Sequence, residues 1–80
     1  MRYVYLLQSE MAGRQRYVGI TSDLKQRIAH HNAGKSPHTS KYLPWKLVTY
    51  VAFSDVRKAE VFEHYLKSGS GHAFAKKRLW

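Results

Sequence analysis

The first twenty residues alternate between apolar and polar positions in the way that favours a β-hairpin. Residues 3–7 read Tyr-Val-Tyr-Leu-Leu, and residues 15–20 form a second β-branched and aromatic segment after a polar turn. If the hairpin closes near Met11, Tyr5 lies opposite Tyr17 on one face of the sheet. Gly19 belongs to the same face, and we expect it to leave space there because it has no side chain.

A third strand is predicted over residues 45–53, where apolar side chains occupy both faces. Such a strand is typical of a well-covered position in a sheet, and we expect it to be buried. Residues 35–44 precede it and contain both prolines of the chain, which indicates a loop with room for one helical turn.

A first helix is predicted from about Ser22 to near Gly34, where glycine can adopt the left-handed conformation that ends helices. Hydroxyl and carboxylate side chains at residues 21–23 can accept hydrogen bonds from the free amides of its first turn. Leu24 and Ile28 lie four residues apart and define its buried stripe. Two polar side chains, Arg27 and His31, fall on or beside that stripe.

A second helix is predicted over residues 56–67, capped by Ser54-Asp55. One face carries an unexpected carboxylate, Glu63, in the i, i+3, i+4, i+7 series that it completes with Ala59, Phe62 and Leu66. Glu60 falls on the outer side and is expected to be solvated. Residues 68–71 break this helix, and a short last helix follows over residues 72–79.

These elements predict a single α/β (α+β) domain over residues 1–80. We expect a small three-stranded antiparallel sheet flanked by helices, in the order β-β-α-β-α-α. The sheet face that bears Tyr5 and Tyr17 should meet Arg27 and Glu63 in one shallow basic groove.

The net charge of the chain limits the kinds of partner that we expect it to bind. Fourteen Lys and Arg against five acids give a formal net charge of +9, which favours a polyanion, most often nucleic acid. A ribosome-associated or scaffold protein with a basic surface is the alternative that charge alone leaves open. The basic side chains that suit backbone phosphates are Lys25, Lys35, Lys41, Lys46, Lys67, Lys76, Lys77 and Arg78.

The sequence also predicts a cytoplasmic protein without a membrane segment. No run approaches the roughly 20 apolar residues that span a bilayer, and the N-terminal apolar segment is too short for the hydrophobic region of a secretory signal. The absence of cysteine excludes disulfides and zinc–thiolate sites and fits a reducing compartment.

Two triplets carry a family resemblance. Tyr3-Val4-Tyr5, then eleven residues, then Tyr17-Val18-Gly19, resembles the two halves of the GIY-YIG nuclease signature. Arg27 follows at the usual place, with His31 one turn later and Glu63 in the later helix. Residues 59–69 resemble the small stand-alone bacterial members of the UPF0213 group. Tyr3 replaces the name-giving glycine, and no asparagine follows Glu63 as it does in some family nucleases.

The resemblance implies a DNA endonuclease that hydrolyses phosphodiester bonds with one divalent metal, Mg²⁺ or Mn²⁺. It implies that Glu63 binds the metal and that Arg27 grips the phosphate. Tyr17, or Tyr5, would orient or deprotonate the attacking water, and His31 is the candidate proton relay. The alternative is a nucleic-acid-binding module with the same fold that cuts weakly or not at all. RNA as the ligand and a protein partner for targeting also stay open.

Overall fold

The computed structural model describes all 80 residues and has the predicted order of elements. They are β1 (Arg2–Ser9), β2 (Arg16–Thr21), α1 (Leu24–Asn32), the one-turn helix η1 (Ser40–Tyr42), β3 (Trp45–Phe53), α2 (Val56–Leu66) and α3 (Gly69–Arg78). The three strands form one antiparallel sheet, so the predicted α/β class and element order are confirmed. The loop before β3 contains its single helical turn in η1.

The sheet is ordered β2-β1-β3, which puts the first strand in the middle. Four consecutive residues of β1, Val4 to Leu7, are buried, because helices cover both faces of this strand. The prediction that residues 45–53 would be well covered was wrong: β3 is an edge strand, in which Trp45 is buried and Tyr50 is half exposed. Its apolar composition fits a position beside β1 but does not reveal which strand is central.

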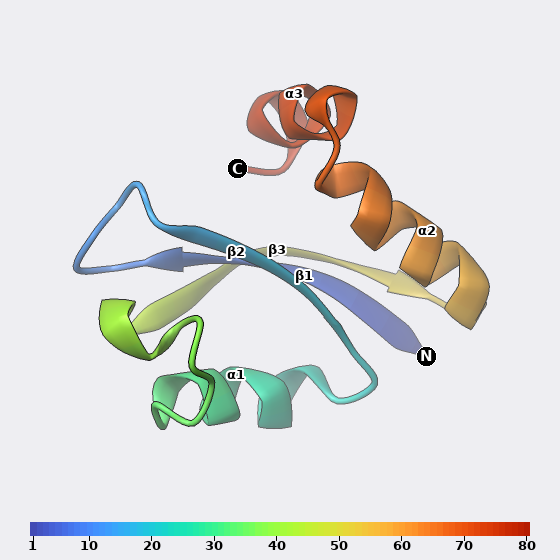
Figure 1. Ribbon diagram of the computed structural model, residues 1–80. Helices are drawn as coiled ribbons and strands as arrows, with labels where there is room; N and C mark the ends of the chain where they lie inside the picture. Colours follow the sequence, from blue (N-terminus) through green and yellow to red (C-terminus); the bar gives the residue numbers. More distant parts are fainter.

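The helices form two layers on opposite sides of the sheet, with α1 on one face and α2 and α3 on the other (Figure 1). Alternate residues of β1 pack into two separate hydrophobic clusters, one on each face of the sheet. Tyr5 and Leu7 pack with Trp45 in the α1 layer. Val4 and Leu6 pack on the other face, in a cluster that includes Ala59, Leu66 and Ala75.

Side-chain caps fix the starts of α1 and α2. Asp23 accepts a hydrogen bond from the amide of Gln26, and Asp55 accepts from two amides in the first turn of α2. Gly34, just beyond the end of α1, has a φ of +74°, the left-handed conformation that glycine was expected to supply. Because Asp23 is the cap, the first helix begins at Leu24, two residues later than predicted.

The third helix begins earlier than predicted. Residues 68–71 were expected to interrupt the helical structure, but residues 69–71 form the first turn of α3, and Ser68 caps it by accepting from the amide of Gly71. Gly71 is buried at the junction of the two helices, where a Cβ would overlap the carbonyl oxygen of Tyr65. Glycine is therefore needed here for close packing of α3 against the end of α2.

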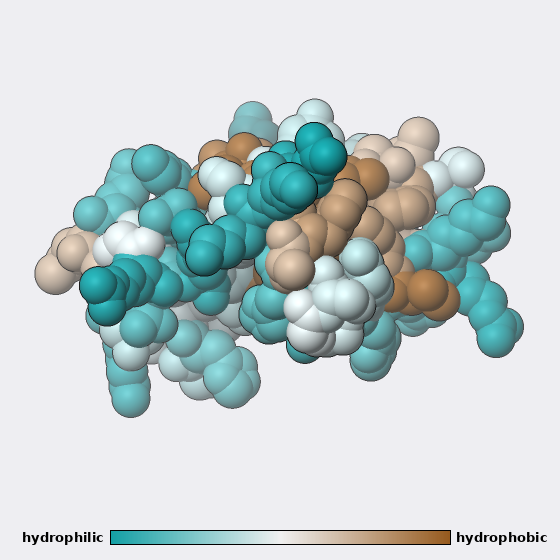
Figure 2. Space-filling view, turned by 90° about the horizontal axis from the view of Figure 1, so that it is seen from above, coloured by the Kyte–Doolittle hydropathy of each residue, from teal (hydrophilic) through white to brown (hydrophobic).

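The outer side of α2 and α3 presents apolar side chains to solvent. Val61, Tyr65 and Phe74 are all exposed, and Figure 2 shows apolar residues gathered in the middle of this face with hydrophilic residues around them. None of the three helices has the length and apolarity that a membrane-crossing helix requires.

Candidate active site

The register of the hairpin brings Tyr5 against a glycine rather than against a second tyrosine. Tyr5 pairs with Gly19, and Tyr17 pairs with Leu7, so the predicted Tyr5–Tyr17 pairing was wrong by one step along the face. The centre of the turn lies one residue farther along the chain than expected, and this shifts each cross-strand partner by two residues. The two phenol rings are nevertheless diagonal neighbours on the same face, with ring centroids 6.2 Å apart.

Gly19 makes room for both rings, as the sequence predicted. A Cβ at this position would lie within 3.0 Å of the Cζ and hydroxyl of Tyr5, and 2.9 Å from a ring carbon of Tyr17. Real Cβ atoms do not approach other atoms so closely. The missing side chain at Gly19 is therefore what lets the Tyr5 phenol lie across the edge strand β2.

His31 holds the Tyr5 hydroxyl from the α1 side. Its Nε2 lies 2.9 Å from the hydroxyl of Tyr5, and its Nδ1 lies 2.8 Å from the Oγ1 of Thr39. Tyr5, His31 and Thr39 are all almost completely buried, and the ring of Tyr17 packs edge-on against the imidazole. The carbonyl of Thr39 accepts from the indole N–H of Trp45, so the network is anchored in the core.

The imidazole of His31 is neutral at neutral pH. Burial lowers its pKa below the ordinary value of 6.5, and the positive charges of Arg27 and His30 lower it further. A neutral imidazole has one donor and one acceptor nitrogen. If the Tyr5 hydroxyl donates to Nε2, the Nδ1–H donates to Thr39, and both ring nitrogens of His31 are satisfied.

The Tyr5 hydroxyl keeps its proton. Burial raises the pKa of Tyr5 well above its ordinary value of 10, and nearby Tyr17 and Glu63 raise it further, while Arg27 acts in the opposite direction. Tyr5 is therefore a hydrogen-bond donor in this site. Tyr17, Arg27 and Glu63 are thus the groups whose charges act on the pKa of this phenol.

Arg27 lies at the open side of the site. It is exposed, and with its neighbours it lines a hollow of about 280 Å³ that has no apolar residue in its wall. The other wall residues come from the end of β2 and the start of α1: Thr21, Ser22, Asp23, Gln26 and His30. A guanidinium that is free of any carboxylate partner here can bind an anion from solvent.

Glu63 lies in the opposite layer, on α2 (Figure 1). It belongs to the inner face of α2, its side chain is 12% exposed, and its carboxylate forms an ion pair with Lys67, one turn farther along the helix. We expected one sheet face to gather all four groups. Instead, Tyr5 and Tyr17 face α1, while the acid comes from the far side of β2. No further strand lies beyond β2, so groups from the two layers can approach each other around this edge of the sheet.

The predicted phosphate-binding residues are all exposed but do not form one groove. Lys25, Lys35 and Lys41 lie in and after α1 and Lys46 lies in β3, whereas Lys67, Lys76, Lys77 and Arg78 belong to the α2 and α3 layer. The two groups are separated by the sheet (Figure 1). Basic charge therefore flanks the site from two sides.

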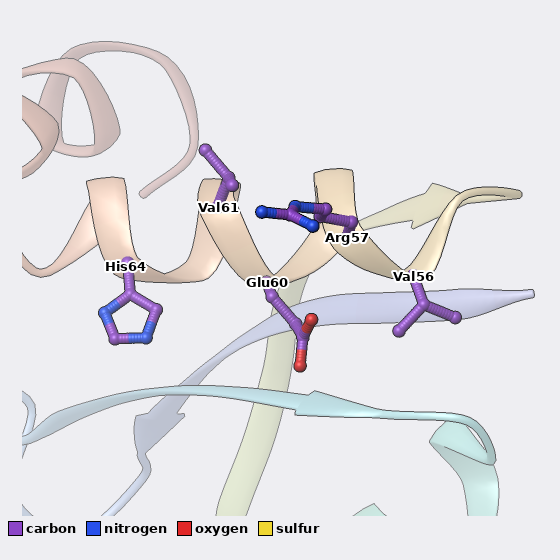
Figure 3. Close-up of a pocket in the computed structure, with 5 residues that line it drawn as sticks. All are labelled: Val56, Arg57, Glu60, Val61 and His64. Carbon is purple, nitrogen blue, oxygen red and sulfur yellow. The ribbon is translucent and has the colours of Figure 1, made fainter.

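A larger hollow, of about 530 Å³, lies on α2 away from these groups. Figure 3 shows Val56, Glu60 and His64 extending from one side of the helix, with Arg57 and Val61 on its other flank. Glu60 is exposed, as predicted. This hollow includes none of the five candidate catalytic residues, so its size does not bear on their chemistry.

Comparison with known proteins identifies the family. The profile of the GIY-YIG catalytic domain matches residues 1–77. The chain belongs to the GIY-YIG nuclease family. It is 40% identical over 77 residues to a UPF0213 protein of Streptococcus pyogenes serotype M5, covering 95% of this chain and 72% of that protein. A UPF0213 protein of Streptococcus pyogenes serotype M3 is 39% identical over the same span.

The GIY-YIG fold is also matched by a solved structure. The solution NMR structure of a UPF0213 protein from Bacillus halodurans aligns with a TM-score of 0.57 and 31% sequence identity, over 96% of this chain and 84% of that one. The resemblance to the small UPF0213 members of the GIY-YIG family is therefore confirmed.

Sequence reasoning missed Thr39, the partner of His31. It lies in the loop before β3, where the mixture of lysines and hydroxyls indicated phosphate contact or an ordinary polar loop. The signal that could have drawn attention to it was the nearby Trp45, whose indole N–H needs an acceptor when it is buried.

Proposed function

We propose that this protein is a divalent-metal-dependent endonuclease that hydrolyses phosphodiester bonds in DNA. The observation that carries the proposal is the Tyr5 phenol, which is bonded to a neutral His31 and lies within the electrostatic reach of Tyr17, Arg27 and Glu63. A nuclease site needs a cation for the phosphate, a carboxylate for a metal and hydroxyls for water, and these groups supply them. A reducing cytoplasm fits the cysteine-free chain.

Arg27 is assigned to the scissile phosphate. Its guanidinium is exposed in a polar hollow and has no carboxylate partner, so it is free to donate two parallel hydrogen bonds to phosphate oxygens. Hydrogen bonds hold the buried side chains of Tyr5, His31 and Thr39 in one arrangement, so a phosphate bound by Arg27 would meet preorganised groups.

Tyr17 is assigned to the attacking water, and Tyr5 to positioning. Tyr5 is 1% exposed and retains its proton, so it does not serve as the base. Tyr17 is partly exposed beside it and can offer its hydroxyl to a water molecule. His31, which is itself bonded to Thr39, holds the Tyr5 hydroxyl, and Tyr17 packs beside the Tyr5 ring that is fixed in this way.

Glu63 fits the role of a single protein ligand for Mg²⁺ or Mn²⁺. Its carboxylate offers hard oxygen donors, and Mg²⁺ commonly binds one carboxylate together with waters and phosphate oxygens. The present partner, Lys67, has a side chain that is 58% exposed, so it can move to a phosphate when a metal takes its place. When bound, the metal would neutralise the charge that develops on the phosphate and the leaving oxygen.

Cleavage assays with a matched pair of variants test this proposal. Supercoiled plasmid and labelled duplex, nicked, flapped and single-stranded DNA are incubated with Mg²⁺ or Mn²⁺. We expect Glu63→Gln to reduce the cleavage rate by at least about 100-fold while DNA affinity changes little. Glu60→Gln, the same substitution three residues earlier at an exposed position, should leave the rate within about twofold. Equal rates for the two variants would refute the role of Glu63.

A nucleic-acid-binding module without turnover is the second candidate. The observation that favours it is the ion pair of Glu63 with Lys67 on a largely buried carboxylate, which a metal must displace. It predicts salt-sensitive binding of DNA or RNA, with no metal-dependent cleavage above that of the Arg27→Ala/Glu63→Gln double variant. A protein partner that targets the domain to its substrate is compatible with either function.

A further inference from the structure

A second hollow lies at the edge of the sheet, on the α3 side of β2. Its volume is about 210 Å³, and its polar wall is made by Arg16 of β2, by His72 and Lys76 of α3, and by Trp80. The guanidinium of Arg16 lies over the indole of Trp80, 4.7 Å from the ring centroid. The backbone N–H of Trp80 donates to the carbonyl of Ala75 at 2.9 Å, and the Trp80 side chain packs against the buried core of the α2 and α3 layer.

The floor of this hollow is apolar. Val18, Leu66 and Ala75 form it, and Leu66 and Ala75 belong to the buried core of the α2 and α3 layer. The hollow therefore offers a flat aromatic and apolar surface framed by cationic side chains from two elements. No acidic residue lines it.

The hollow adjoins the candidate active site. Leu66 in its floor is one turn beyond Glu63 on the same face of α2, so the two residues are about 4.5 Å apart along the helix axis. On β2, Arg16 and Val18 flank Tyr17, whose side chain points to the other face of the sheet. A polynucleotide strand that passes over the Glu63–Lys67 pair along this edge would reach the hollow with its next nucleotide.

We propose that this hollow binds the nucleotide that flanks the scissile phosphodiester. The base stacks on the Arg16–Trp80 pair, and the phosphate is bound by Lys76 and His72. Aromatic rings beside cations are the recurring means of binding nucleotides without reading their sequence, because every base has a π-face. The inference rests on the proposed nuclease function for the position of the scissile bond, but the binding that it predicts does not require cleavage.

Trp80 itself provides the assay. The chain has two tryptophans, and the other, Trp45, is 4% exposed with its indole N–H bonded inside the protein. A short single-stranded oligonucleotide, which offers unstacked bases, is titrated into the metal-free protein, and tryptophan emission is recorded. We expect saturable quenching that disappears in Trp80→Phe. Inorganic polyphosphate, which carries the charge without bases, should leave the emission unchanged.

Affinity measurements on three variants complete the test. Arg16→Ala should weaken oligonucleotide binding roughly 5- to 150-fold, the range for loss of one stacked base. Lys76→Gln should also weaken it and lower the slope of log affinity against log salt by about 0.7. Lys58→Gln removes the same charge from an exposed position outside the hollow and should have the smaller effect.

The outcomes separate this site from the nuclease proposal. Quenching at Trp80 in a protein that cleaves no DNA would support the site and refute the nuclease function. Cleavage without quenching, and with Arg16→Ala and Lys58→Gln equal in affinity, would refute the site and leave the nuclease function intact. Quenching by polyphosphate equal to that by the oligonucleotide would refute base stacking.

Discussion

Replacing Gly19 by alanine tests the central geometry of this site. The added methyl group would enter the space that the Tyr5 and Tyr17 rings now occupy, and the Tyr5 ring would have to withdraw by about 1 Å to restore ordinary contact. Tyr5 is fully buried between the sheet and α1, so it cannot move into solvent. A shift of this size away from β2 breaks or strains the 2.9 Å hydrogen bond between Tyr5 and His31.

The cost follows from two terms. Overpacking of a well-packed core costs about 1–3 kcal/mol, and loss of a buried hydrogen bond adds about 1 kcal/mol. We therefore expect Gly19→Ala to lower the free energy of unfolding by about 2–4 kcal/mol. For a domain of this size each kcal/mol lowers the melting temperature by about 4–8 °C. If the nuclease proposal holds, a 1 Å displacement should also reduce cleavage by about 100-fold.

Urea and thermal unfolding followed by circular dichroism measure the first effect, and the plasmid assay at a temperature where the variant is folded measures the second. Gly69→Ala is the matched control, because nothing lies within 4 Å of a Cβ there. The control should unfold within about 0.5 kcal/mol of the wild type. A Gly19→Ala protein that is as stable as Gly69→Ala would refute the close contact between Gly19 and Tyr5.

Three further predictions concern the supports of the site. The pKa of His31 is lowered in the folded state, so as the pH falls the unfolded state takes up the proton first, and the free energy of unfolding should fall by up to about 1.4 kcal/mol per pH unit below pH 6.5. Urea unfolding from pH 8 to 5 should show this slope, and His31→Gln should lose it. Gly71→Ala places a methyl group on the carbonyl oxygen of Tyr65 and should cost at least about 3 kcal/mol in the same measurement; a value below 1 kcal/mol would contradict the packing of α3 on α2. Asn32→Ala removes two hydrogen bonds to the backbone of Trp45, at 2.7 and 3.0 Å, and should cost about 1–3 kcal/mol; an unchanged urea midpoint would show that water replaces them without loss.

Local chemistry made the helices predictable. Asp55 caps α2 by the mechanism that the sequence indicated, and its predicted start at Val56 is confirmed. The beginning of α3 was missed because Gly69, Ser70 and Gly71 are poor helix formers in isolation. Tertiary packing decides there, since Gly71 is needed for contact with the end of α2 and Ser68 supplies the cap.

Strand order and register were harder to predict from the sequence than the helices. The burial of β1 and the exposure of β3 depend on which strand is central, and strand order is a non-local property that the alternation of side chains does not encode. The register depends on where the turn closes, and a shift of two residues keeps every side chain on its predicted face. That is why Tyr5 and Tyr17 were correctly expected on one face while their pairing was wrong.

The separation of the acid from the tyrosines across two layers gives the edge strand its importance. A carboxylate on α2 and phenols on the α1 face can act on one phosphate only at an edge of the sheet, and β2 is the edge strand that carries Tyr17. A residue without a side chain is then needed on β2 where the Tyr5 ring extends over it, and Gly19 is the residue that pairs with Tyr5. On the same strand, Tyr17 faces α1 while Arg16 faces the α3 side. One edge strand thus connects the catalytic proposal with the nucleotide-binding hollow, because its alternation places a phenol on one side and a cation on the other.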